Sequence, residues 1–154
     1  MTRLGILVAL LLICSSSIAQ ECFQYYKEHC HPEKSNFHYN VNDKSTSFLF
    51  SSGETREIPF ILQNGKDYRI QICADPVFED IIKFEIVGVS ENNTIYTNSS
   101  NNFALNLEFV NRKTQEVKMI LAAPELAEGM SDSIYYQGCI ALLIEEMITV
   151  KTGF

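Results

Sequence analysis

The chain has 154 residues, with 12 basic and 19 acidic side chains and a formal net charge of −7 at neutral pH. This length suits one ordinary domain and is large enough to bury a hydrophobic core. The acidic balance argues against nucleic acid or an anionic membrane surface as the partner, because both attract basic proteins.

The first 19 residues have the pattern of an export signal. Arg3 precedes an apolar run, and Ser17-Ile18-Ala19 forms a small-x-small cleavage site. The apolar run is shorter than the roughly 20 residues that span a bilayer, which disfavours a retained anchor, and no second run of that length follows. We therefore predict a secreted or periplasmic protein with no membrane span after cleavage. The predicted segments are a signal peptide (1–19), an N-terminal Cys-containing segment (20–46) and a β-sandwich domain (47–154).

Four cysteines remain after the predicted cleavage, and an even count in an exported chain indicates two disulfides. These cysteines are Cys22, Cys30, Cys73 and Cys139. A helix over this stretch would separate Cys22 and Cys30 by about 12 Å. A disulfide needs a Cα separation below about 7 Å. We favour bonds from Cys22 and Cys30 to Cys73 and Cys139, and the alternative is a local Cys22–Cys30 bond with Cys73–Cys139.

The predicted elements begin with a short helix over Glu21–Pro32 and continue with strands. Apolar residues recur at helical spacing before Pro32, which stops the helix. Beyond it the apolar residues alternate with period two, which is typical of half-buried strands. The predicted strands carry Phe37, Tyr39 and Val41; Phe48 and Phe50; Ile58, Phe60 and Leu62; Tyr68, Ile70 and Ile72; Ile82, Phe84 and Ile86; residues 94–97; Phe103, Leu105, Leu107 and Phe109; Val117, Met119 and Leu121; and residues 138–144.

Two of these strands meet at Asn64-Gly65. A two-residue hairpin loop there would place the apolar face of one strand opposite the polar face of the other, so we disfavour it. A three-residue loop over residues 64–66 aligns the apolar faces, and an arch between two sheets also points both sets inward. Either arrangement buries the same residues. Pro59 cannot donate a ladder hydrogen bond, which indicates a sheet edge.

The last predicted strand, Gly138–Ile144, is apolar on both faces, so we expect it to be central or covered. Its second face carries Cys139, and Cys73 falls on a similar outward position. We expect the N-terminal segment to lie over that face. The sequence therefore predicts an all-β protein, a jelly-roll-like β-sandwich of about eight strands with a short N-terminal helix or loop packed on it.

The central block resembles the pre-peptidase C-terminal family of secreted bacterial β-sandwiches over residues 47–147. The matching residues are Phe60-x-Leu62, Asn64-Gly65, Tyr68-x-Ile70-x-Ile72, Phe84-x-Ile86 and Gly138-Cys139-Ile140. The chain is also similar to short exported bacterial proteins with an E-C-x3-Y start and a G-C-I-x-L-L-I-E-x-M end. These resemblances imply a bacterial source and a non-catalytic accessory role.

Three groups of residues could form a metal site or a catalytic site, and each also fits an ordinary structural role. His29, His31 and His38 lie near Cys30, but a zinc site needs four convergent ligands and an exported cysteine is usually oxidised. Three acidic residues in one loop offer oxygen ligands for calcium, without the spacing of a known calcium loop. They are Asp75, Glu79 and Asp80. We predict no catalytic residues and no cofactor, with calcium as the weak alternative.

Glu145-Glu146 is an adjacent carboxylate pair at the end of the last predicted strand, and its members should point to opposite faces. The sequence contains no hydrolase or phosphate-loop motif. Aromatic residues beside loops are the better candidates for ligand contact: Tyr96, Tyr135 and Tyr136. We predict a secreted, non-catalytic accessory, binding or scaffold module whose partner is an unknown protein or glycan. The alternatives are a carbohydrate- or protein-binding adhesion module and a small hydrolase with an unrecognised site.

Overall fold

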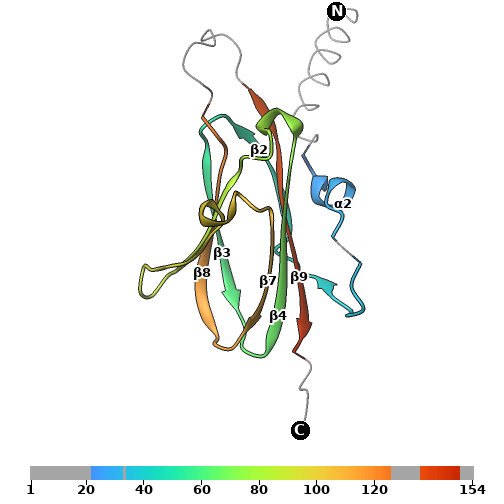
Figure 1. The fold of residues 1–154 in the computed structure, drawn as a ribbon, viewed down its shortest axis with the longest axis vertical. Helices are drawn as coiled ribbons and strands as arrows, with labels where there is room; N and C mark the ends of the chain where they lie inside the picture. The colour runs from blue at the N-terminus through green and yellow to red at the C-terminus, as the bar shows by residue number, and fades with distance from the viewer. Residues whose placement is uncertain (1–21, 33, 126–135, 150–154) are drawn as a thin grey trace, which may run out of the picture.

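The computed structural model describes residues 22–32, 34–125 and 136–149 (Figure 1). Within these residues it contains one short α-helix, two 3-10 turns and nine strands in two antiparallel sheets, which confirms the predicted all-β sandwich. The helical elements are α2 (Tyr25–His29), η3 (Pro76–Phe78) and η4 (Asn98–Asn101). The strands are β1 (Asn40–Val41), β2 (Thr46–Ser51), β3 (Thr55–Leu62), β4 (Lys66–Ala74), β5 (Lys83–Gly88), β6 (Thr94–Thr97), β7 (Asn106–Asn111), β8 (Gln115–Ala122) and β9 (Gln137–Ile148).

The strand order is that of a jelly roll. Sheet A has the order β1-β9-β4-β7, with β2 also paired to β9, and sheet B has the order β3-β8-β5-β6. Strands β2 to β9 thus form two four-stranded sheets by Greek-key connections, and β1 extends sheet A. Strand β9 lies between β4 on one side and β1 and β2 on the other. This central place confirms the expectation drawn from its two apolar faces.

The connection at Asn64-Gly65 is the arch, because β3 belongs to sheet B and β4 to sheet A. The three-residue hairpin was the wrong alternative. The arch and the hairpin bury the same side chains, so the sequence pattern did not distinguish between them. All six lie in the core at 7% exposure or less: Ile58, Phe60, Leu62, Tyr68, Ile70 and Ile72. Gly65 adopts a φ of 76°, which favours glycine, and Pro59 does lie on the edge strand β3.

The expected strand over Phe103–Phe109 is wrong at its start, since β7 begins at Asn106. Phe103 has a φ of 54° and is 36% exposed. The cause lies in Asn98, which is fully buried. Its amide oxygen accepts from the Phe84 N–H at 2.8 Å and its amide nitrogen donates to the Ile82 carbonyl at 2.8 Å. The chain folds back on this residue, because the Phe103 N–H donates to the Asn98 carbonyl at 3.0 Å.

The N-terminal segment packs on the outer face of sheet A, where Figure 1 shows α2 beside β9. Disulfides join Cys22 to Cys139 and Cys30 to Cys73, so the favoured pairing is confirmed and the local one is wrong. Tyr25 packs with these cysteines over Ala141 and Leu143 of β9. The helix is shorter than the expected Glu21–Pro32. The expected strand over residues 37–41 is likewise reduced to Asn40–Val41.

Candidate functional site

Two adjoining hollows lie where β3 ends and β8 begins. The first has a volume of about 530 Å³ and is bordered by the turn 42–44, by β3 and by Val89 after β5. The second has a volume of about 510 Å³ and is bordered by residues of the β5–β6 connection and the β7–β8 turn. Both hollows include Ile61 and Glu116. We treat them as one surface, the Ile61 hollow.

The floor of the Ile61 hollow is aliphatic because of the alternation along β3. Ile58, Phe60 and Leu62 point into the core, so Pro59 and Ile61 face outward. Ile61 is 54% exposed and pairs across the sheet with Glu116. Val89 adds a second exposed aliphatic side chain from the far side. Exposed aliphatic residues gathered in a hollow with charged neighbours are typical of a binding surface.

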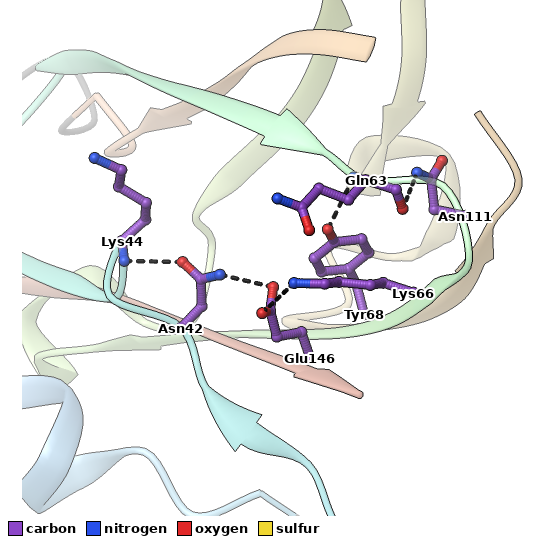
Figure 2. Close-up of polar contacts among 7 residues, drawn as sticks. All are labelled: Asn42, Lys44, Gln63, Lys66, Tyr68, Asn111 and Glu146. Carbon is purple, nitrogen blue, oxygen red and sulfur yellow. Dashed lines mark hydrogen bonds and ion pairs between the residues drawn. The ribbon is translucent and has the colours of Figure 1, made fainter. Parts of the chain in front are cut away.

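The turn that forms one wall is held in place by a polar network (Figure 2). The Asn42 side-chain oxygen accepts from the Lys44 N–H at 2.9 Å, which closes the turn on itself. The Asn42 amide nitrogen donates to Glu146 Oε2 at 2.7 Å, and Lys66 Nζ donates to Glu146 Oε1 at 2.5 Å. Figure 2 shows the Lys44 side chain extending away from Glu146. This wall is therefore preformed and presents a lysine.

A second part of the network fixes Gln63 at the end of β3 (Figure 2). The Gln63 N–H donates to the Tyr68 hydroxyl at 2.9 Å, and Asn111 Nδ2 donates to the Gln63 and Lys113 carbonyls, each at 2.7 Å. Tyr68 is fully buried, and that burial raises the pKa of its hydroxyl above the ordinary value. The phenol therefore stays neutral and serves as a structural hydrogen-bonding group beneath the hollow.

Of the tyrosines predicted to contact a ligand, the two that the structure describes, Tyr96 and Tyr136, do not line this hollow. The Tyr96 ring packs on Phe84 with centroids 5.9 Å apart, and its hydroxyl oxygen is shielded from solvent without a hydrogen-bond partner among the described residues. Tyr136 directly precedes β9, and its carbonyl accepts from the Ser52 N–H at 3.0 Å. Tyr135 lies outside the described residues. Tyr96 thus lies in β6 of sheet B, whereas Tyr136 lies next to β9 of sheet A.

The residues considered for metal binding are separated. His29 stacks on Tyr25 with ring centroids 4.0 Å apart, and Cys30 is bonded to Cys73. Asp75 Oδ1 accepts from the Val77 N–H at 3.2 Å and so caps η3. In the part of the chain that the structure describes, no group of three or more His, Cys, Asp or Glu side chains converges as a metal site.

Glu145 and Glu146 point to opposite faces of β9, as predicted. Glu145 is 7% exposed on the outer face and accepts from Arg69 Nε at 2.6 Å, whereas Glu146 joins the network beside the Ile61 hollow. The hydrogen bond to Glu145 raises the pKa of Arg69. Sequence reasoning missed Glu146 as part of a site. It also missed Ile61, although an isoleucine at an outward position of an alternating strand is a usable signal.

No family model matches the chain, and a search of characterised proteins likewise finds no match. The resemblance to secreted bacterial β-sandwiches therefore stays a prediction. No helix among residues 22–32, 34–125 and 136–149 is long and apolar enough to cross a membrane.

Proposed function

We propose that the protein is an exported, non-catalytic binding module that holds a segment of another protein in the Ile61 hollow. The predicted export signal and the two disulfides support a secreted or periplasmic place of action, because disulfides persist in oxidising compartments. The weak calcium alternative plays no part in this proposal.

One observation carries the proposal, namely an aliphatic floor inside a fixed polar rim. Pro59, Ile61 and Val89 supply the apolar centre, and the rim includes Lys44 and Glu116. An apolar centre with a polar, solvent-accessible rim is the usual anatomy of a protein–protein interface. Since hydrogen bonds to Glu146 and Tyr68 hold Asn42 and the Gln63 main chain beside this rim, binding would order little of the main chain there, which lowers its entropic cost.

A glycan is the second candidate partner, because amide and charged groups along the rim can hydrogen-bond to sugar hydroxyls. Asn42, Lys44 and Gln63 provide such groups. The aliphatic floor favours the protein partner, since every aromatic ring of the described lining belongs to Phe60, which is only 6% exposed.

The test is to pan a displayed random-peptide library and a glycan array in parallel against the wild type and against Ile61→Glu. We expect peptides enriched on the wild type to lose binding to Ile61→Glu. Ile81→Glu is the matched control, because Ile81 is 46% exposed and does not line the hollow. Peptide binding that survives Ile61→Glu contradicts the proposal, and glycan signal lost on Ile61→Glu supports the second candidate.

The hydrolase alternative has its own test. Glu116 is the carboxylate that both hollows share. A panel of ester, peptide and glycoside substrates should show no turnover above the buffer rate. Turnover by the wild type that Glu116→Gln abolishes would replace the binding module with an enzyme.

A further inference from the structure

In the part of the chain that the structure describes, strand β7 is a sheet edge, and no strand pairs with its outward side. Among the described residues β7 pairs with β4 alone. The Ile72 N–H donates to the Leu105 carbonyl at 2.8 Å, which fixes the alternation of hydrogen bonds along the strand. Asn106, Glu108 and Val110 therefore direct their N–H and C=O groups away from β4. All three are exposed, so this side of β7 can accept another strand.

The other sheet edges carry stronger features that discourage strand addition than β7, whose one charged residue is Glu108. Strand β3 contains Pro59, β6 has four residues paired to β5 in an irregular register, and β1 and β2 are separated by the turn after Val41. Prolines, short strands and interruptions are the usual protections of an edge. Strand β7 has six residues without proline, lysine or an irregularity in its register with β4.

Charge decides how two copies of β7 can pair. Two registers overlap β7 to the same extent. One places Glu108 opposite Glu108 of the second copy, and like charges directly opposite are destabilising. A shift of two residues places Phe109 on the two-fold axis and Glu108 opposite Val110 of the second copy. Glu108 then has two diagonal neighbours in the second copy, Glu108 and Arg112, so the like charge is no longer directly opposite and a cation lies within reach of a long side chain. Arg112 is exposed, and it forms no ion pair with the described residues.

We propose that β7 pairs antiparallel with β7 of a second copy of this chain, around a two-fold axis at Phe109. The pairing joins the two copies of sheet A into one sheet and covers Val110, which is 51% exposed in the single chain. No residue of β7 lines the Ile61 hollow, so a dimer presents two hollows at once. Two sites on one particle strengthen binding to a multivalent partner without any new contact.

The test is sedimentation velocity of the disulfide-bonded protein at rising concentration. The salt should be about 0.15 M, where a Debye length of about 8 Å screens the repulsion between two acidic chains. We expect the sedimentation coefficient to move from the monomer value towards the dimer value. A monomer at every concentration up to about 100 μM overturns the proposal, because the dimer would then be weaker than most specific complexes.

Val110→Pro tests the strand pairing directly. The Val110 N–H points away from β4, so proline removes a hydrogen bond of the dimer and none of the single sheet. We expect the dissociation constant to rise at least about tenfold, the effect of losing one or two such bonds. Circular dichroism checks that the variant is folded. A dimer that Val110→Pro leaves unchanged overturns the proposal.

The register is tested by charge reversal, which also covers the case in which the proline variant does not fold. Arg112→Glu and Glu108→Arg should each weaken the dimer, and the combined variant should restore it, because the pair then has its signs exchanged. Arg112→Glu is the cleaner single change, since Glu108 also lies 3.9 Å from Arg69 in its own chain. Failure of the combined variant to restore the dimer overturns the register with Phe109 on the axis.

Discussion

The outer faces of the two sheets differ in what covers them. On sheet A, three outward residues of β9 pack beneath Tyr25 in a cluster that includes both disulfides: Cys139, Ala141, which is fully buried, and Leu143, which is 4% exposed. On sheet B, the outward side chains alternate with the core positions and stay in solvent, as Ile61 and the Lys118–Glu57 ion pair show. A face that is apolar by sequence requires a cover, and the uncovered face is the one that remains open to a partner.

The largest effect should come from removing the cover on sheet A. Replacing Cys22 and Cys139 by alanine opens a link across 117 residues of the chain. The chain-entropy model assigns such a link about 4–5 kcal/mol, so we expect the free energy of unfolding to fall by about 3–5 kcal/mol. Urea denaturation with the Cys30–Cys73 bond intact measures this. A loss below about 1 kcal/mol would show that the cover does not depend on this bond.

The second prediction compares an ion pair on the outer face of sheet A with one on the outer face of sheet B. The side chains alone of Arg69 and Glu145 are 11% and 9% exposed. The Tyr39 ring lies against Arg69, with its centroid 4.5 Å from the guanidinium carbon. Arg69→Met leaves a buried carboxylate unpaired and should cost about 3–5 kcal/mol. Lys118→Met is the matched change on sheet B, where the partners are 46% and 54% exposed, and it should cost at most about 1 kcal/mol.

Chemical denaturation of both variants decides this prediction. Similar losses for Arg69→Met and Lys118→Met would mean that the two outer faces are equally solvated. The difference between the two faces would then be one of composition and not of burial.

A smaller effect concerns pH at the β2–β3 turn, which joins the two sheets. The Ser51 N–H donates to Glu54 Oε2 at 2.9 Å and Arg56 Nε donates to Glu54 Oε1 at 2.7 Å. The Ser51 hydrogen bond, with help from Arg56, lowers the pKa of Glu54 below its ordinary value of 4.5. The stabilisation is therefore present above pH 4.5 and disappears as the pH falls through the lower, folded-state pKa.

Glu54→Gln should remove this part of the acid sensitivity. Thermal unfolding between neutral and acidic pH should show a shallower decline for the variant, while Glu91→Gln, an exposed control, should follow the wild type. Parallel curves for the wild type and Glu54→Gln would refute the assignment.

The sequence was sufficient to predict packing where the side chains of a single strand indicate what lies against each of its faces. The two apolar faces of β9 predicted a cover, and the outward Cys73 predicted that the N-terminal segment supplies it. It was insufficient where several segments meet. The Phe103–Phe109 pattern runs through a turn that depends on hydrogen bonds from Asn98 to the start of β5. The Ile61 hollow likewise combines residues near positions 43, 60, 89 and 115, which only the jelly-roll topology brings together.

The smallest effect on stability should come from Ile61 itself. Ile61→Ser changes a side chain that is 54% exposed, so the free energy of unfolding should move by no more than about 0.5 kcal/mol. Its neighbour in the chain provides the contrast, because Leu62 is 1% exposed and Leu62→Ala should cost about 2–5 kcal/mol. Denaturation of the two variants measures which face of β3 the core uses. An Ile61→Ser loss as large as that of Leu62→Ala would mean that a further segment covers sheet B, and the hollow would then be an internal contact instead of a site for a partner.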